Sequence, residues 1–358
     1  MMQLTGRYIM ILAVTLMLGV TGTVTHPMSL EAPFAETLSL VKESSTQERY
    51  VVRVPQDFPT IQAAVDAVAE GGTVLIGPGI YKENLTITKS VRLVGAGQEQ
   101  VQLQYTDPDH PIIQIIPEDF VQIHFQNLTI GDPAFPIEQV DVPPTLIGPK
   151  LAGRGLKIFA PVQMVLRRVT IGGLISGVDL FPLGRYLVIF PSQVILEEVK
   201  LVRNWVGLAS LGVHLLVVRS KIEENIIGGL IGAHEERILF SQSSISRNRE
   251  FGINLILGSV FGNTPFDFIV EENEFKQNGV GIVMSNAREG NSIRIEGNRF
   301  VQNKRYGIAI VDPTCPIDPL ISLPKIPLIQ IFGGGNEFHN NGQDLCPLDY
   351  PWPPGFRK

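Results

Sequence analysis

The sequence predicts an all-β fold in which one chain winds into a solenoid of stacked short strands, a single-stranded parallel β-helix of about 12 coils. Three observations lead to this prediction. An asparagine recurs at spacings of 21, 23, 30, 25 and 38 residues, with apolar residues at fixed offsets before it. The 358 residues include 35 Gly and 26 Pro beside 44% apolar residues, a composition typical of many short strands and turns. A helical period is clear in one stretch near the start.

The N-terminus carries a mostly apolar run of thirteen residues, Tyr8 to Val20. Such a run is too short to span a bilayer and suits the core of a signal peptide. Val20 and Gly22 are small enough for a cleavage site. We therefore predict that residues 1–22 are a cleaved signal peptide and that the protein is secreted or periplasmic, at the cell envelope. An uncleaved membrane anchor is the alternative, and residues 23–48 are predicted to be a leader or linker.

The β-helix domain is predicted over residues 49–346. Four apolar residues at i, i+3, i+4 and i+7 share one helical face, which predicts a capping helix over residues 59–70: Ile61, Ala64, Val65 and Val68. Short runs around this helix are predicted to be strands: Val51–Pro55, Thr73–Ile76, Asn84–Ile87 and Ser90–Val94. Proline-rich residues 132–148 indicate a loop that leaves the stack, and residues 347–358 are predicted to be a proline-rich tail.

Residues 57–97, DFPTIQAAVDAVAEGGTVLIGPGIYKENLTITKSVRLVGAG, resemble the start of pectin-lyase-like right-handed β-helix proteins. Pectin methylesterases open in a similar way, and so do exported β-helix repeat proteins such as the periplasmic NosD kind. The resemblance implies a right-handed coil with a helix that caps the end of the stack. Because enzymes and non-enzymes share this cap, the resemblance implies a fold and not an activity.

Six asparagines define the repeat of the second half: Asn204, Asn225, Asn248, Asn278, Asn303 and Asn341. A large apolar residue lies three positions before each, and a mostly small polar residue lies five before. Parallel strands in adjacent coils lie about 4.8 Å apart, so equivalent positions stack. We expect the asparagines to form a structural ladder at a corner, with side-chain amides bonded between coils. We expect the following glycines to give the corners their backbone freedom: Gly207, Gly229, Gly252, Gly281 and Gly307.

A leucine-rich repeat is a competing interpretation, because Leu196 to Asn204 fits that pattern. The pattern needs an apolar residue five positions before each asparagine. The next five repeats place Ser or Asn there, and helix-forming stretches between repeats are missing. The sequence therefore favours the β-helix.

Two carboxylates are the first candidates for chemistry, since Glu271 and Glu296 both lie seven positions before a repeat asparagine. In adjacent coils they would repel, raise one pKa or bind a cation. The favoured interpretation is solvated surface charge, neutralised by Arg294 and Arg299 nearby.

A second set of repeat positions, nine residues before each asparagine, could form part of the outer surface. Nine positions before each asparagine lie Ile195, Leu216, Leu239, Ile269, Arg294 and Phe332. If these side chains face outward, they form an apolar row that a loop or partner would cover. A local shift of register would place them in the interior, and the sequence leaves the two arrangements open.

Asp267-Phe268-Ile269 is similar to the Asp-Phe-Ile of the methylesterase nucleophile strand. The family's glutamine-containing oxyanion motif and second acid strand are not apparent, and Leu183-Gly184-Arg185 lacks the Pro-Trp that follows in the family. Asp267 is therefore not supported as a nucleophile. Together with Glu271 and Glu296 it is a weak catalytic candidate, and we predict no catalytic residue.

We also expect no metal site and no cofactor, because none of the six histidines is paired at i, i+2 or i, i+4. The NosD resemblance implies one alternative, a copper site assembled across coils. Cys315 and Cys346 are the two cysteines. In an exported protein such a pair predicts one disulfide, with free thiols as the alternative.

The leading functional hypothesis is a non-catalytic envelope or extracellular protein that binds a glycan or a protein along the rod. It rests on the lack of a legible catalytic set. Alternatives are a polysaccharide lyase or glycoside hydrolase, and a periplasmic accessory protein for metal-enzyme maturation. The net charge of −6 argues against nucleic acid as a partner, and no membrane span is expected after signal cleavage. The sequence predicts neither the ligand nor the oligomeric state.

Overall fold

The structure is a computed structural model, and it describes most of the chain from residue 49 onward. The described residues are 49–136, 153–159, 161–180, 192–232, 237–256, 267–285, 292–315, 317 and 329–356. The predicted signal peptide and leader lie outside them, and the predicted loop after Asp132 is described only as far as Pro136.

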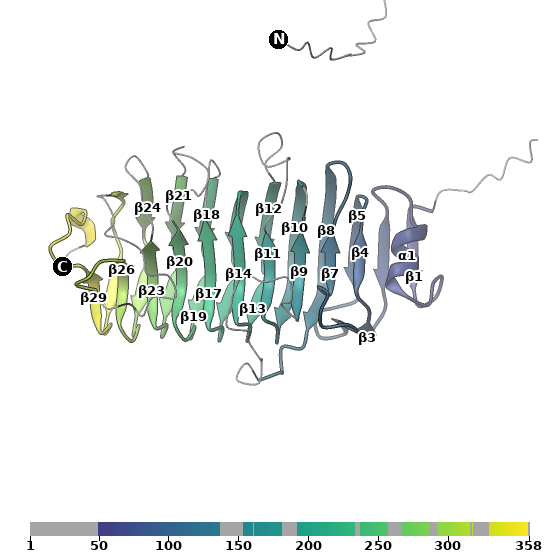
Figure 1. Cartoon of the computed structure of the whole chain (residues 1–358), viewed down its shortest axis with the longest axis horizontal. Helices are drawn as coiled ribbons and strands as arrows, with labels where there is room; N and C mark the ends of the chain where they lie inside the picture. The colour runs from purple at the N-terminus through teal and green to yellow at the C-terminus, as the bar shows by residue number, and fades with distance from the viewer. Residues whose placement is uncertain are drawn as a thin grey trace, which may run out of the picture. The chain divides into compact units, whose positions relative to one another are not determined.

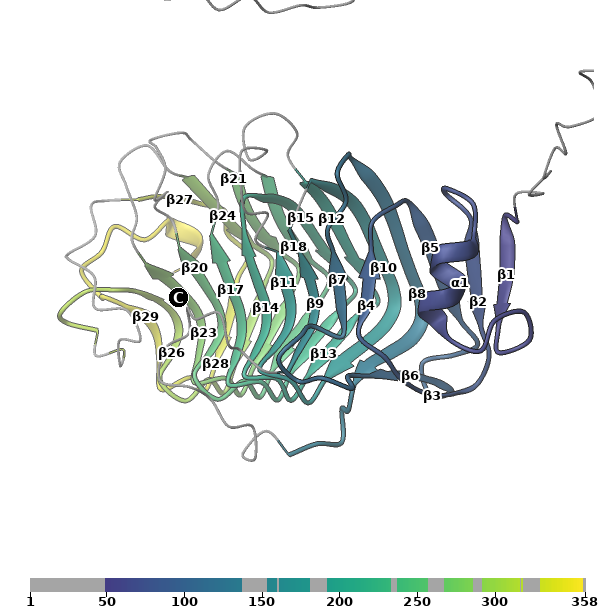
Figure 2. The same ribbon diagram turned by 45° about the vertical axis from the view of Figure 1, so that its right-hand side comes forward.

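The chain winds through three faces of parallel strands, which we call Face 1, Face 2 and Face 3 in the order in which each coil meets them (Figures 1 and 2). Faces 1 and 2 belong to one 19-stranded sheet, joined through β8 and β10. Face 1 contains β1 (Val51–Val54), β2 (Thr73–Ile76), β5 (Val91–Gly95), β8 (Val121–Gly131), β10 (Val162–Gly172), β12 (Ser192–Glu197), β15 (Val213–Val218), β18 (Arg237–Ser241), β21 (Asp267–Glu271), β24 (Ser292–Glu296) and β27 (Gln330–Phe332).

Face 2 contains shorter strands and the ends of β8 and β10, which bend across the corner from Face 1. Its other strands are β3 (Gly79–Lys82), β6 (Val101–Gln104), β13 (Lys200–Val202), β16 (Lys221–Glu223), β19 (Ser244–Ser246), β22 (Glu274–Lys276), β25 (Arg299–Val301) and β28 (Glu337–His339).

Face 3 is the separate 10-stranded sheet. It contains β4 (Leu85–Ile87), β7 (Ile113–Ile115), β9 (Arg154–Ile158), β11 (Ser176–Leu180), β14 (Val206–Leu211), β17 (Ile227–Gly232), β20 (Phe251–Ile256), β23 (Val280–Ser285), β26 (Tyr306–Ile310) and β29 (Gln343–Cys346).

The predicted parallel β-helix is confirmed, because each strand pairs in parallel with its equivalent in the next coil. Face 1 has eleven strands in the described residues, slightly fewer than the coils we expected. The expected number of coils is the length of the domain divided by the length of one typical repeat, and some coils are longer than that repeat. Face 1 begins at Val121 in β8 and next at Val162 in β10.

The predicted N-terminal capping helix is present as α1 (Ile61–Ala67), and it packs on β1, β2 and β4. Thr60 begins it as the N-cap and accepts a hydrogen bond from the Ala63 amide through its hydroxyl. The Glu83 carboxylate accepts from the amides of Ile61 and Gln62, each at 2.9 Å. These bonds satisfy amides that a helix start leaves without partners.

The core lies between the three faces and consists of inward side chains that stack from coil to coil. The alternation of buried and half-exposed residues along β12 and β15 shows one side chain in two facing inward. In Face 2 the rings of Phe275, Phe300 and Phe338 stack with centroids 4.9 and 5.0 Å apart. At the C-terminal end Trp352 and Phe356 are buried against this core.

From β8 onward the chain turns between its faces through residues with positive φ, and these residues are mostly not glycine. The corner between Faces 2 and 3, which we call the ladder corner, uses Arg203, Glu224, Arg247, Gln277, Gln302 and Asn340. The corner between Faces 1 and 2, which we call the first corner, uses Asn127, Arg168, Glu198, Arg219, Gln242, Glu272, Gly297 and Gly335. Polar side chains at both corners therefore project from a left-handed turn.

The expectation that the repeat glycines supply corner flexibility is wrong. Those glycines lie in Face 3 strands, where, for all of them except Gly229, the constraint is space between coils. A Cβ on Gly281 would lie 2.4 Å from the Gly307 carbonyl oxygen and 3.0 Å from the Phe300 ring. Glycine is needed there because the neighbouring backbone approaches so closely.

The six predicted asparagines line the inside of the ladder corner, and each bonds to the next. The backbone amide and the Nδ2 of Asn225 both donate to Oδ1 of Asn248, at 3.1 and 3.0 Å. The same Nδ2 also donates to the Leu201 carbonyl oxygen at 3.0 Å. The pattern continues through Asn278 and Asn303 to Asn341. The first corner has a parallel ladder: Ser220, Ser243, Asn273, Asn298 and Asn336.

Removing one member of the asparagine ladder should be costly. Asn248→Ala removes the hydrogen bonds that the Asn248 side chain makes with the Asn225 amide, Asn225 Nδ2 and the Ile222 carbonyl. We expect a loss of about 3 kcal/mol in the free energy of unfolding, measured by urea denaturation. Asn340→Gly at the exposed turn, which keeps the positive φ accessible, should cost less than about 1 kcal/mol. Equal costs for the two variants would contradict the ladder's role.

The close approach of coils at Face 3 gives a second prediction. Gly281→Ala should destabilise the protein by about 3 kcal/mol, because backbone atoms must move to admit the methyl group. Gly97→Ala is the control, since a Cβ there meets Gln100 side-chain atoms at an ordinary 3.6 Å. Thermal melting of the two variants measures the difference. A melting temperature of Gly281→Ala equal to that of the wild type would refute the packing argument.

Candidate functional site

The predicted candidates Glu271 and Glu296 lie directly opposite each other in β21 and β24. Arg294 contacts both, with Nη2 3.4 Å from Glu271 Oε2 and Nε 2.7 Å from Glu296 Oε2. All three side chains are at least 30% exposed. The structure therefore places them in a solvated ion-paired cluster. Asp267 stands in register with Arg237 and Ser292 through its backbone, and its side chain lies outside what the structure describes.

The apolar row whose direction the sequence left open faces outward. Ile195, Leu216, Leu239 and Ile269 are adjacent on the outer side of Face 1 and partly exposed. They alternate with fully buried side chains in the same strands. Val165 extends the row on one side, and Arg294 ends it on the other. A smooth aliphatic strip of this kind offers contact area and no acid or base.

A richer polar surface runs along the outside of the ladder corner. Two grooves lie there end to end and share Arg247. The N-terminal groove, of about 430 Å³, is lined by Ala134, Pro136, Arg203, Glu224, Asn225, Ile226, Arg247 and Arg249. The C-terminal groove, of about 630 Å³, is lined by Arg247, Gln277, Gln302, Lys304 and Asn340. We call the two together the corner groove.

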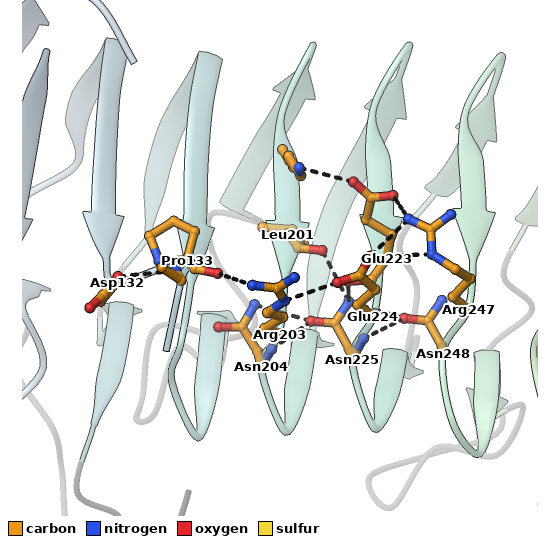
Figure 3. Close-up of polar contacts among 12 residues, drawn as sticks. Asp132, Pro133, Leu201, Arg203, Asn204, Glu223, Glu224, Asn225, Arg247 and Asn248 are labelled. Atoms are coloured by element: carbon orange, nitrogen blue, oxygen red, sulfur yellow. Dashed lines mark hydrogen bonds and ion pairs between the residues drawn. The ribbon is translucent and has the colours of Figure 1, made fainter. Parts of the chain in front are cut away.

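Figure 3 shows the ion-pair network that orders the N-terminal groove. Arg203 Nε donates to Glu224 Oε2 at 2.9 Å, and Arg247 Nη2 donates to Glu224 Oε1 at 3.0 Å. Arg247 Nη2 also bonds to Glu223, which lies 3.1 Å from Lys200 Nζ. Successive coils thus supply alternating charges at neighbouring positions.

The loop after β8 closes the N-terminal end of the corner groove. Arg203 Nη1 donates to the Pro133 carbonyl oxygen at 3.3 Å, as Figure 3 shows. Ala134 and Pro136 line the groove beside it. The Asp132 carboxylate accepts from the Ala134 amide at 3.0 Å and thereby fixes the turn that begins this loop.

The network also determines charge states. Burial pushes the pKa of Glu224 upward, but hydrogen bonds from Arg203 and Arg247 outweigh it and hold that pKa below its usual range. Burial likewise opposes the charge of Arg247, yet the bonds to Glu224 and Glu223 raise its pKa. The network therefore favours the charged forms of Glu224 and Arg247.

In the C-terminal groove amides replace the carboxylates. Gln277 Nε2 donates to Gln302 Oε1 at 3.2 Å, so these side chains form an outer row parallel to the asparagine ladder beneath. Lys304 and Asn340 complete the lining. Amides both donate and accept hydrogen bonds, and this surface can therefore bind hydroxyl-rich or anionic groups.

A buried charge cluster on Face 3 was missed from the sequence. Asp179 is 5% exposed, accepts from the Ser176 hydroxyl, and lies 3.2 Å from Arg154 Nε. Lys157 is its register neighbour in β9 and lies over the Phe159 ring. The available signal was a lone acid in the apolar run Ser176–Leu180. The cations beside it, Arg154 and Lys157, stand more than twenty residues earlier, and the sequence alone therefore gave no reason to place them next to Asp179.

Burial dominates the electrostatics of this cluster. It raises the pKa of Asp179 even though the Ser176 bond and the charges of Arg154 and Lys157 oppose the shift. Burial and then the charge of Arg154 lower the pKa of Lys157. Because Asp179 is enclosed, the cluster is part of the interior of Face 3 and is not a solvent-facing site.

The structure joins Cys315 and Cys346 by a disulfide over a sequence separation of 31 residues. Both sulfurs belong to a second hydrophobic cluster outside the core, together with Val283 and Ala309 of Face 3. The bond holds the segment after β26 to the last strand of that face. Closing a loop of this size removes chain entropy from the unfolded state worth about 3 to 4 kcal/mol.

The described histidines lie apart from one another. His110 contacts Asp107 at 2.7 Å, and His214 Nδ1 accepts from the Arg237 amide at 2.9 Å. Within the described ranges there is no group of three or more His, Cys, Asp or Glu side chains that could hold a metal ion. Among the same residues no helix has the length and apolar character needed to cross a membrane.

Comparison with known proteins agrees with this architecture. Residues 191–315 match the family model described as a right-handed β-helix region. Among solved structures, Dettilon tailspike protein (gp208) is 13% identical with a TM-score of 0.52, over 82% of this chain and 64% of the tailspike chain. The described residues thus form a right-handed parallel β-helix, as predicted. At this identity the similarity shows the fold alone.

Two further structures share the fold at lower similarity. The A-module of Azotobacter vinelandii mannuronan C-5 epimerase AlgE4 is 17% identical with a TM-score of 0.37, over 81% of this chain and 93% of the module. Pectin methylesterase from carrot is 11% identical with a TM-score of 0.37, over 82% of each chain. No curated protein matches the sequence.

The raised pKa of Asp179 predicts a pH dependence. A carboxyl whose folded pKa exceeds its unfolded value of about 3.9 contributes stability that is complete below that value and is lost as pH rises through the folded pKa. Asp179→Asn cannot ionise, so its melting temperature should rise relative to the wild type between about pH 4 and pH 7.

Melting curves over that pH range measure this effect. Asp109→Asn, at an exposed position, is the control and should track the wild type. A melting temperature of Asp179→Asn that falls relative to the wild type as pH rises would show that the Arg154 pairing dominates instead.

Proposed function

We propose that this protein is an exported, non-catalytic binding protein that holds an extended glycan lengthwise in the corner groove. One observation carries the proposal. A polar side chain projects from the same left-handed position of successive coils, from Arg203 to Asn340, and these positions line two contiguous grooves. A solenoid repeats its surface along one axis, which suits an extended ligand.

The chemistry of the lining supports a sugar chain. Sugar hydroxyls are both donors and acceptors, and amide side chains such as Gln277 and Gln302 can serve them in both directions. Guanidinium groups add fixed, directional donors. The arginines of the N-terminal groove are held by carboxylates, so less side-chain freedom is lost on binding.

The rigidity of the corner supports the same proposal. Directly beneath the groove, the asparagine ladder ties each left-handed turn to the next coil. The outward side chains therefore keep a spacing of about 4.8 Å per coil. Such pre-organisation lowers the ordering cost of binding to a long chain.

The outer Face 1 supports binding over catalysis. The carboxylates Glu271 and Glu296 are joined by Arg294 on a solvated surface. Beside them runs the aliphatic row of Ile195, Leu216 and Leu239, which offers no proton donor or acceptor. Export rests on the signal sequence that we predict for residues 1–22.

A glycan array probed with the mature protein tests the proposal, with release of sugar ends measured on every hit. We expect binding without turnover. The double variant Gln277→Ala/Gln302→Ala should weaken binding at least about tenfold, because two amides leave the groove. Gln242→Ala is the matched control, since Gln242 has the same left-handed backbone at the first corner. It should bind within about twofold of wild type.

Three results would contradict the proposal. Release of unsaturated or reducing ends would make the protein an enzyme. Equal losses in the control and the double variant would place binding elsewhere. An array without hits would favour a protein partner.

A further inference from the structure

The two halves of the corner groove differ in charge. Glu224 lines the N-terminal half among arginines. The described residues that line the C-terminal half are two cations, Arg247 and Lys304, and three amides, with no carboxylate among them. The protein as a whole has a net charge of −6, so the positive charge of this lining is opposite in sign to the net charge of the protein.

The ion-pair network strengthens this asymmetry, because it holds more cations than anions. Lys200, Arg203 and Arg247 surround only two carboxylates, Glu223 and Glu224. One positive charge is therefore left over. Since the carboxylates lie on the N-terminal side of Arg247 (Figure 3), the excess is available toward the C-terminal half.

Arg247 is also oriented for this role. Its Nε and Nη2 bond to the two glutamates. In Figure 3 its other terminal nitrogen points away from both of them. Arg247 lines the C-terminal groove as well as the N-terminal one. The hydrogens of Nε and Nη2 are thus taken by the glutamates, and the two N–H groups of the remaining terminal nitrogen are left as directional donors for an oxyanion.

The remaining lining supplies donors suited to the same group. Lys304 contributes an ammonium with three hydrogen-bond donors. Gln302 already accepts the amide hydrogen of Gln277 through its oxygen, and its own nitrogen can donate. Asn340 offers a second amide from the following coil. An oxyanion needs donors and no acceptors, and these side chains can provide them together.

We infer that the C-terminal half of the corner groove is an anion subsite, which binds a carboxylate or sulfate group carried on the glycan. This inference rests on the proposed function and names the class of ligand. Arg247 is the fixed donor and Lys304 the mobile one. The N-terminal half, where Glu224 is ionised, binds the hydroxyl groups of the same chain.

Three polymers with one backbone test the inference: dextran, carboxymethyl-dextran and dextran sulfate, with binding to the full mature protein measured by calorimetry. We expect at least one anionic polymer to bind about tenfold or more tightly than dextran at low salt. The advantage should shrink at 0.5 M salt, where charges are screened within about 4 Å. The tighter of the two anionic polymers identifies the group as carboxylate or sulfate.

Variants locate the effect. Lys304→Gln should lower affinity for the preferred anionic polymer about three- to tenfold and change dextran binding by less than twofold. Arg247→Gln should lower affinity for the anionic polymer by a similar factor and, because Arg247 also lines the N-terminal groove, should weaken dextran binding to a smaller extent. Arg219→Gln, which has the same left-handed backbone at the first corner, and Lys82→Gln, in β3 at the N-terminal end, are the matched controls and should change neither. The exposed Lys304 keeps the test valid if Arg247→Gln unfolds.

Each other outcome overturns the inference. Equal binding of all three polymers would remove the anion preference while leaving glycan binding intact. Equal losses in the control variants would mean general attraction to cations on the surface. Binding of none of the three would overturn the subsite, and the glycan array would then judge the proposed function separately.

Discussion

From β12 onward the backbone of each coil turns at two corners through a left-handed residue, and the polar groups inside that turn are cut off from water. A buried amide or carbonyl without a partner costs about 1 to 3 kcal/mol, so a stack of such corners could not persist unless each group were bonded. The inward asparagines meet this requirement. Asn225, for example, uses its backbone amide, both ends of its side chain and two neighbouring coils. The rest of the structure depends on that arrangement, because it fixes both the spacing and the register of the coils.

Once the register is fixed, every outward position becomes a column along the rod. The aliphatic row on Face 1 and the polar row at the ladder corner are two such columns. Residues that lie 21 to 24 apart in sequence meet as neighbours, as Arg203 meets Glu224 and Arg247 meets Glu223. A binding surface can therefore be assembled on this fold by changing single positions in successive repeats. No separate loop or domain is needed to bring the groups together.

The repeat asparagines predicted the fold, because their offset to apolar residues reports directly on stacking. The same offsets could have predicted the ladder-corner network, since Arg203, Glu224 and Arg247 all stand one position before an asparagine. Assigning the corners to the repeat glycines hid the role of the residue that precedes each asparagine. The glycines are needed instead where Face 3 strands approach closely. The Asp179 cluster was beyond reach because its strands, β9 and β11, precede Asn204, the first repeat asparagine, so no repeat position marked Asp179 or its register partner Lys157.

The ladder has a direction. Each asparagine donates toward the C-terminus and accepts from the N-terminal side. At one end Asn204 Oδ1 is a buried acceptor for which the described residues show no donor. At the other end Asn341 Nδ2 donates to the Asp344 carboxylate at 3.0 Å. These two end groups do not depend on how many asparagines lie between them. Duplication or loss of a whole coil would therefore change the length of the rod, and of any chain it binds, without changing the energetics of its ends.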